Sequence, residues 1–203
     1  MLIDLTHKFT AQMPVYPGDN PSELQQVNFV EQGGIAHFHI ATGMHVGTHI
    51  DAPMHMLEGG KKISDYPLEH FFGRGCLIDA RGKDKIDVDL LDGIELQSDD
   101  IVLILTGHDK KFRAPDYFDA FPMLTEAFAE KLVNDGVKIV ALDTPSPDGE
   151  PFSIHKILLE RDVLIIENGT NFDRLIDQKN FEVTALPVNF EAEASLVRLV
   201  ARY

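Results

Sequence analysis

The sequence predicts a mixed α/β fold in β/β/α layers, with a largely parallel central sheet and a second, antiparallel sheet. Short apolar runs rich in Val and Ile recur along the chain, bounded by Gly, Asp or Pro, which is typical of strands buried on both faces. Helical patterns lie between several of these runs, whereas the flanking segments alternate without intervening helices. With 203 residues and no repeat or linker, we expect one domain spanning 1–203.

The apolar runs give the expected strands in chain order. Buried strands are predicted at 2–5, 75–80, 100–107, 137–144 and 162–170. Alternating antiparallel strands are predicted within 26–32, 36–50, 181–193 and 195–203. Between them, 82–99 and 108–122 are interpreted as surface excursions. Cys76 lies in the second buried run, so we interpret it as a core thiol rather than a nucleophile.

Three segments have helical patterns. The first, 124–136, ends at Gly136 and has one apolar stripe, made of Leu124, Phe128, Leu132 and Val133. The second, 153–162, has Ser153 as its expected N-cap. A shorter helix is expected at 66–73.

Charge and composition exclude several classes of function. The chain has 18 Lys and Arg against 33 Asp and Glu, a net charge of −15, which disfavours nucleic acid and anionic membranes as partners. Its longest apolar stretches are far shorter than the ~20 residues that cross a bilayer. The N-terminus lacks a signal-peptide pattern, so we expect a cytoplasmic protein. A single cysteine excludes an internal disulfide and any multi-cysteine zinc site.

Residues 43–55 (GMHVGTHIDAPMH) contain an unusual concentration of metal-binding side chains. Three histidines and an aspartate fall within 11 residues: His45, His49, Asp51 and His55. Imidazole together with carboxylate suits Zn, Mn, Fe or Co(II) and is too rich in nitrogen for Ca or Mg. All separations are even, so a strand places the four side chains on one face.

The same segment must bend sharply if these side chains are to share a metal. Four strand residues span ~13 Å, whereas two nitrogens bound to one metal at ~2.1 Å lie ~3 Å apart. We therefore expect a strand that runs into a tight turn at Gly47, because glycine tolerates the backbone angles of such a turn.

The segment 43–79 closely resembles the signature of the Putative cyclase family of metal-dependent hydrolases, which includes bacterial kynurenine formamidase and isatin hydrolase. The resemblance extends over nearly the whole chain, through LIDLTHKFTAQMPVYPGD at the start, LDTPSPD at 142–148 and EASLVRLVAR at the end. It implies the family's swivelling-domain-like β/β/α fold. It also implies homodimers or larger assemblies, for which the closing segment 195–203 is a candidate intersubunit or intersheet strand.

The resemblance further implies a site for one or two divalent transition-metal ions per chain, Zn²⁺ or Mn²⁺. The matching ligands are His45, His49 and Asp51 for a first ion, and His155 and Glu167, with Asp51 bridging, for a second. Glu167 also ends an apolar strand, where α/β sheets commonly bind ligands.

His55 matches the family's catalytic base and acid. A metal acidifies bound water towards pKa ~7 and polarises a carbonyl, and a nearby free imidazole can move the proton to the leaving nitrogen. We therefore predict hydrolysis of a carbon–nitrogen bond in an aryl or cyclic amide, arylformamidase-like. The alternatives are a lactonase or cyclase acting on a related carbonyl, and a non-catalytic metal-binding protein, against which the free imidazole argues.

The substrate is expected to be a small amide, lactam or ester that contacts Tyr16. This residue lies in a loop resembling the family's pocket loop, where the formamidases typically carry Trp. Because the chain has no Trp, N-formylkynurenine is disfavoured as the substrate. Roles stay open for four further residues: His37 and His39, which line the pocket if their strand is unbroken, and His108 and Ser146, which follow predicted strands.

Overall fold

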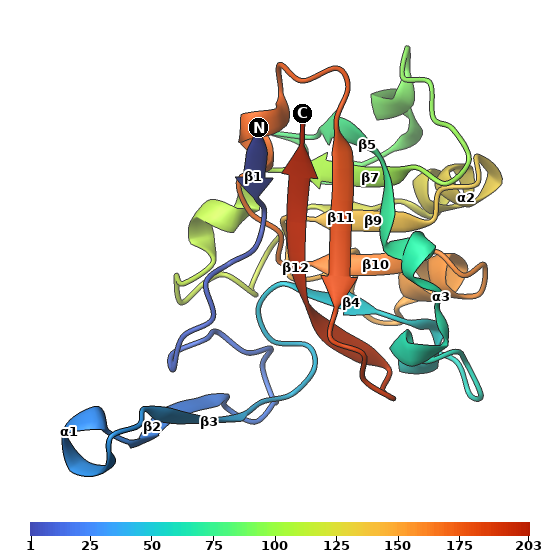
Figure 1. The fold of residues 1–203 in the computed structure, drawn as a ribbon. Helices are drawn as coiled ribbons and strands as arrows, with labels where there is room; N and C mark the ends of the chain where they lie inside the picture. The colour runs from blue at the N-terminus through green and yellow to red at the C-terminus, as the bar shows by residue number, and fades with distance from the viewer.

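A closed β-sheet forms the body of the protein (Figure 1). The computed structural model describes residues 1–203. Seven strands follow one another around the ring, and the last pairs back with the first: β12 (Ala194–Arg202), β11 (Glu182–Pro187), β5 (Phe72–Asp79), β7 (Ile101–Leu105), β9 (Ile139–Leu142), β10 (Leu164–Glu167) and β4 (His49–Asp51). β1 (Leu2–Asp4) pairs with the end of β12.

The sheet is half parallel and half antiparallel. β5, β7, β9 and β10 are mutually parallel, whereas β11, β12 and β4 are antiparallel to their neighbours. The predicted α/β class is confirmed, but the predicted layering is not matched, because the main antiparallel strands join the parallel ones in a single closed sheet. The long strand β12 pairs with β11 along one edge and with β4 along the other, so the two halves close into one sheet.

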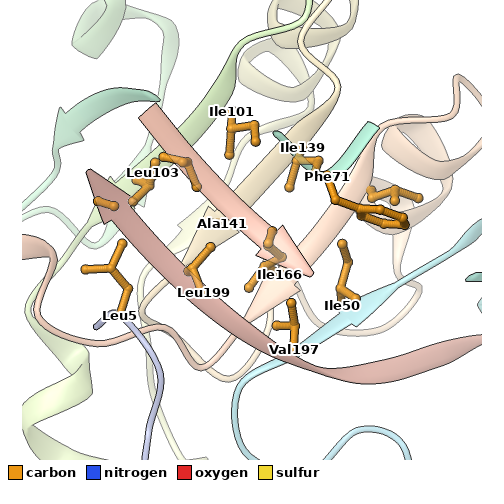
Figure 2. Close-up of a cluster of buried hydrophobic side chains, with 14 of the residues drawn as sticks. Leu5, Ile50, Phe71, Ile101, Leu103, Ile139, Ala141, Ile166, Val197 and Leu199 are labelled. Carbon is orange, nitrogen blue, oxygen red and sulfur yellow. The ribbon is translucent and has the colours of Figure 1, made fainter. Parts of the chain in front are cut away.

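The barrel interior is a core of aliphatic side chains (Figure 2). Along β7, Ile101 and Leu103 point inwards, and Leu199 of β12 meets them from the antiparallel half. The alternate residues of β7, Val102 and Ile104, belong to a second core on the outer face. The parallel strands are therefore buried on both faces, which explains their continuous apolar runs.

Two helices cover the outer face of the parallel strands. α2 (Glu126–Asn134) contributes Phe128 and Leu132, and α3 (Ser153–Leu159) contributes Leu158 to the outer core. No helix has the combination of length and apolarity that spanning a membrane requires. Six 3-10 helices complete the helical structure: Pro53–His55, Ile63–Asp65, Leu68–Phe71, Val88–Leu91, His108–Lys111 and Phe172–Leu175.

The predicted start of α3 is wrong in one respect. Ser153 is the first helical residue, and the N-cap is Phe152, which has a left-handed backbone at φ 61° and no capping side chain. The Asp148 carboxylate replaces the cap, because its Oδ2 accepts a hydrogen bond from the backbone N–H of Ile154 at 2.7 Å. The loop after β9 is thereby tied to the first turn of α3.

Residues 23–41 form an arm that extends away from the barrel (Figure 1). β2 (Glu23–Asn28) pairs with β3 (His37–Ala41), and the short helix α1 (Val30–Gly33) connects them, where a strand over 26–32 was expected. The predicted surface excursions are also partly wrong. The segment 108–122 buries Phe112 and Tyr117, and β6 (Lys85–Ile86) pairs with β8 (Met123–Leu124) to link the two regions.

Candidate metal centre and cavity

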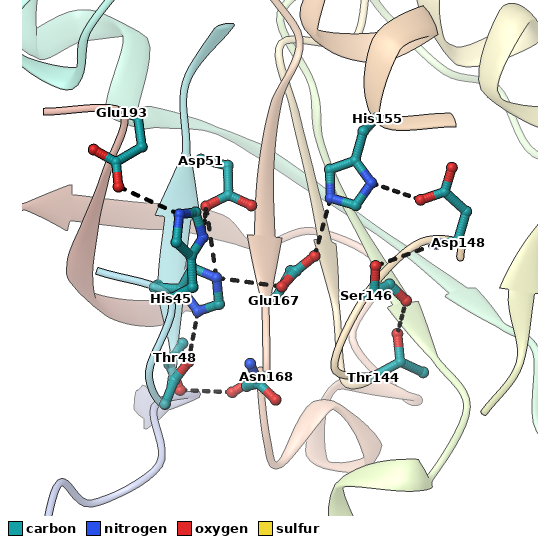
Figure 3. A network of polar contacts seen from close by, with 12 residues as sticks. His45, Thr48, Asp51, Thr144, Ser146, Asp148, His155, Glu167, Asn168 and Glu193 are labelled. Atoms are coloured by element: carbon teal, nitrogen blue, oxygen red, sulfur yellow. Dashed lines mark hydrogen bonds and ion pairs between the residues drawn. The ribbon is translucent and has the colours of Figure 1, made fainter. Parts of the chain in front are cut away.

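The pairing of β4 with β10 places three potential metal ligands together. His49 lies directly opposite Glu167, and Asp51 is two residues further along β4, on the same face. Ile50 and Ile166, which alternate with them, point into the barrel interior. The polar side chains therefore lie on the outer face of the barrel wall, where α3 approaches with His155 (Figure 3).

Gly47 forms the predicted turn between His45 and His49. Its backbone has φ +69°, and the strand begins only at His49, so His45 lies before the turn and folds back over β4. The His45 and His49 rings reach a centroid separation of 5.1 Å. The expected bend is confirmed, whereas a strand carrying all four side chains is not, because His55 lies on the 3-10 helix Pro53–His55.

The donor atoms are spaced as ligands of shared ions would be. Asp51 Oδ1 is 3.0 Å from His45 Nδ1 and 3.5 Å from His49 Nε2. Glu167 bridges the other side, with Oε2 3.2 Å from His49 Nε2 and Oε1 3.3 Å from His155 Nε2. Two ligands at ~2.1 Å from a tetrahedral ion lie about 3.4 Å apart, close to these separations.

Several of these buried atoms have no hydrogen-bond partner in the protein. His49 Nε2 and both carboxylate oxygens of Asp51 are buried and unpaired, and Asp51 is fully buried. Unpaired buried polar atoms are costly, and the same atoms are the ones a cation would satisfy. The three imidazoles and two carboxylates therefore fit a divalent transition metal.

Hydrogen bonds to the opposite ring nitrogens aim two histidines at the centre. His49 Nδ1 lies 2.8 Å from the Gly47 carbonyl oxygen, so Nδ1 carries the proton and Nε2 faces Asp51 and Glu167 with a free lone pair. His155 Nδ1 lies 2.6 Å from Asp148 Oδ1, which leaves its Nε2 facing Glu167 (Figure 3). These contacts fix the tautomers that metal binding requires.

The histidines and carboxylates stabilise each other's charged forms. Burial by itself lowers the pKa of His45 and of His155, but the nearby carboxylates outweigh it and raise these pKa values to about 9 and about 10. Burial likewise disfavours ionised Asp51, yet the surrounding histidines bring its pKa well below the usual range. Without metal, this cluster therefore retains protons at neutral pH that a cation has to displace.

His55 has the opposite electrostatic setting. Burial, reinforced by the neighbouring His45 and His155, outweighs the carboxylates and lowers the pKa of His55. Its ring lies 4.1 Å from that of His45 and 5.7 Å from that of His155, measured between centroids. A neutral imidazole beside the potential metal ligands can accept a proton at neutral pH.

The donor atoms form two groups, each with its members within 4.8 Å of one another, and Asp51 belongs to both. One group is His45, Asp51 and His55, and the other is His49, Asp51 and Glu167. This division differs from the expected one, which placed His49 with His45 and left His55 unligated. The shared position of Asp51 is consistent with a bridging carboxylate.

A cavity of about 290 Å³ opens beside these side chains. Its volume is at the lower end of the range of small-ligand sites, about 300–1,000 Å³. Tyr16 lies on its wall and meets Phe118 edge-to-face, with 5.6 Å between ring centroids. The lining residues are Pro14, Tyr16, Asp19, His45, Gly47, His55, Met56, Phe118, Pro145, Ser146, Phe152, His155, Glu167 and Asn168.

The four residues with open roles lie in different parts of the structure. Ser146 lines the cavity, but its hydroxyl is involved only in a 3.4 Å contact with the N–H of Asp148. His37 and His39 lie on the exposed strand β3 of the arm and line no part of the cavity. His108 is buried, and its Nε2 lies 2.8 Å from the carbonyl oxygen of Tyr117. It does not line the cavity, but Tyr117 precedes the lining residue Phe118.

Sequence reasoning missed several residues of this region, among them Phe118 on the cavity wall and four others. Asp148, Phe152 and Asn168 lie on turns, and Glu193 approaches His45 from the segment before β12, with Oε1 3.5 Å from Nε2. A signal existed only for Asp148, because it ends the LDTPSPD match and precedes His155 by seven residues. The other three are brought to the site by turns whose direction the sequence does not specify.

Comparisons with known proteins agree with this architecture. The family model described as Putative cyclase matches residues 3–149. The kynurenine formamidase of Bacillus cytotoxicus is 30% identical over 98% of this chain and 96% of its own. A structure described as a potential metal-dependent hydrolase with cyclase activity is 27% identical, with a TM-score of 0.80 over 99% of this chain and 96% of its own.

A more distant solved structure shares the fold. Isatin hydrolase A from Labrenzia aggregata is 20% identical and superimposes with a TM-score of 0.87 over 99% of this chain and 93% of its own. The family match covers well over half of the chain, on the segments that carry the histidine cluster and the first strands of the barrel. This chain belongs to the Putative cyclase family.

Proposed function

We propose that this protein is a metal-dependent hydrolase that cleaves the carbon–nitrogen bond of an aryl or cyclic amide. The observation that carries the proposal is the convergence of His45, His49, Asp51, His155 and Glu167 beside an aromatic-lined cavity. Support also comes from the full-length similarity to a kynurenine formamidase.

The five converging side chains are the proposed metal ligands. When bound, a divalent transition metal supplies polarisation of a carbonyl and acidification of water. Asp51 and Glu167 each face two histidines, so either carboxylate is able to connect two ions. The donor set suits Zn²⁺ or Mn²⁺, and we propose one or two ions per chain.

His55 is the proposed general base and acid. It lines the cavity, and its lowered pKa keeps the imidazole neutral and able to take a proton from water. The resulting imidazolium then protonates the leaving nitrogen, which departs as an amine. The neighbouring Asp51 carboxylate stabilises the transient positive charge on His55.

The substrate is proposed to be a small aryl or cyclic amide held by the aromatic wall. Tyr16 and Phe118 present an edge-to-face pair, which can contact a planar ring on its face or edge. The volume of about 290 Å³ is large enough for such a ring together with the scissile group. The absence of tryptophan supports formanilides and isatins over N-formylkynurenine.

The direct test is a metal assay followed by a substrate screen. Purified protein should contain about one or two transition-metal ions per chain and should hydrolyse at least one formanilide, isatin or lactam. Lactones belong in the same screen, because exclusive turnover of lactones would instead support the lactonase alternative. Metal-bound protein without any turnover would support the non-catalytic alternative.

We further propose that 1–203 is one domain, that it is cytoplasmic, and that it assembles as a homodimer or larger oligomer. The pairing of β12 with β1, β4 and β11 of its own chain favours the intersheet role of the closing strand over the intersubunit role. The arm gives better support, since Val30, Ile35 and Phe38 are more than half exposed on a hairpin with little core of its own. Sedimentation equilibrium tests this proposal.

A further inference from the structure

Asn168 presents an unused hydrogen-bond donor to the cavity. It directly follows the metal-site residue Glu167, yet both line the cavity, which two successive residues of an extended strand do not do. The reason is the left-handed backbone of Asn168, at φ 56°, which turns its side chain to the same side. Figure 3 shows Asn168 beside Glu167, where β10 ends.

The backbone of Asn168 is held from both sides. Its N–H donates to the carbonyl oxygen of Thr144 at 2.9 Å, and its own carbonyl oxygen accepts from the Thr48 hydroxyl at 2.6 Å. The first contact connects it to the loop after β9, and the second connects it to the turn that precedes β4. Asn168 is therefore fixed relative to the turn that carries His45 and to the loop whose Asp148 holds His155.

Tyr117 sets the direction of the Asn168 amide. Its hydroxyl lies 2.6 Å from Asn168 Oδ1, and the tyrosine is completely buried. Burial and nearby carboxylates raise the pKa of Tyr117, so the hydroxyl keeps its proton and donates it to Oδ1. With Oδ1 engaged, the amide nitrogen Nδ2 is left without an acceptor in the protein, on a residue that lines the cavity.

We propose that Asn168 Nδ2 donates a hydrogen bond to the carbonyl oxygen of the substrate, and that Tyr117 is the positioning residue that aims it. The inference rests on the proposed function, because it assigns a partner to a carbonyl in the same cavity. A preorganised neutral donor of this kind binds the carbonyl and interacts more strongly as negative charge grows on its oxygen. It therefore acts more on kcat than on KM.

The test uses metal-loaded wild type with two single variants and the double variant. Asn168→Gly removes the amide while keeping a residue that tolerates φ 56°, and Tyr117→Phe removes only the aiming hydroxyl. We expect Asn168→Gly to lower kcat for a formanilide about 100-fold and to weaken binding of acetanilide about fivefold, with unchanged metal content. Tyr117→Phe should give a smaller loss in kcat.

The double variant separates positioning from a general structural effect. If Tyr117 acts through Asn168, adding Tyr117→Phe to Asn168→Gly should leave kcat and acetanilide affinity where Asn168→Gly alone puts them. Independent, multiplying losses would overturn the positioning role, and wild-type kinetics in Asn168→Gly would overturn the whole inference. Absence of turnover in wild type would instead count against the proposed function, and acetanilide affinity would still decide on Asn168.

Discussion

Asp148 forms hydrogen bonds both with the His155 ring and with the first turn of the helix that carries it. Its Oδ1 lies 2.6 Å from His155 Nδ1, while its Oδ2 accepts from the Ile154 N–H at the start of α3. One carboxylate therefore sets the ring orientation of a proposed metal ligand and replaces the missing N-cap. The position of His155 in the proposed metal centre therefore depends on the conformation of the loop after β9.

Replacing this carboxylate should weaken metal binding without removing a ligand. In Asp148→Asn the amide is a poorer partner for His155 Nδ1 and no longer favours the tautomer with Nε2 free. We expect metal affinity to fall about 10- to 100-fold, measured by competition with a chromophoric chelator. Asp162→Asn, at an exposed carboxylate paired with Lys61, is the matched control and should leave affinity unchanged.

Metal affinity should rise steeply with pH. The pKa values of His45 and His155, about 9 and about 10 without metal, lie above neutrality, so between pH 6 and 8 both imidazoles are protonated before metal binds. Each displaced proton adds about a factor of ten in affinity per pH unit. Zinc competition titrations at pH 6, 7 and 8 should show a slope of one to two decades per unit, and a flat profile would contradict this electrostatic account.

The variant His55→Ala distinguishes a general-base role of His55 from a metal-ligand role. If His55 moves the proton, the variant should keep its metal and lose about 10²- to 10⁴-fold in kcat/KM. His70→Ala, at a partly buried histidine beside Tyr66 and outside the cavity, should stay close to wild type. Loss of metal together with activity in His55→Ala would show instead that this imidazole is a ligand of the group it forms with His45 and Asp51.

Gly47→Ala should damage the metal centre through the backbone. A side chain at φ +69° costs about 1–2 kcal/mol of stability, and the new Cβ would come within 2.6 Å of Met13 Cε. The turn that brings His45 to His49 would shift, so metal affinity should fall together with the free energy of unfolding. Gly82→Ala has a similar φ of +76° with open space around it, and should lose stability while keeping its metal affinity.

His7 should make the fold sensitive to mild acid. Its ring stacks on Phe112 at a centroid separation of 3.7 Å, and burial lowers the pKa of His7 to about 4. The unfolded chain takes up this proton near the ordinary pKa of about 6.5, whereas the folded protein does not. The contribution of His7 to stability is therefore complete above pH 6.5 and is lost as the pH falls towards 4.

His7→Phe keeps an aromatic ring against Phe112 and removes the titrating group. Urea unfolding of wild type and variant at pH 7.5 and pH 5 should show a smaller loss of unfolding free energy in the variant. His39→Phe, on the exposed strand β3, should reproduce the wild-type dependence. An equal pH dependence in wild type and His7→Phe would contradict the assignment.

Most of the elements could be predicted from local patterns. The runs around Leu103 and Ile166 are apolar because they are buried on both faces, inside the barrel and under the helices, so their sequence indicates strands directly. The histidine spacing and Gly47 likewise predicted a bent metal-binding segment, since the geometry of ligation leaves few other conformations. These features depend on residues close together in the chain.

Closure of the sheet and completion of the site depend on pairings that the local pattern does not encode. Alternation in 195–203 indicated a strand, but the register that places Leu196 opposite His49 and so closes the barrel is a long-range choice. The register that sets His49 against Glu167 is of the same kind. The Asp148 contact with His155, seven residues away, and the inward turn of Asn168 depend instead on loop conformations that the apolar pattern does not specify. Local sequence specifies which side chains are able to bind a metal. How they meet is set by the fold, because pairing across more than a hundred residues is selected by packing of the whole barrel.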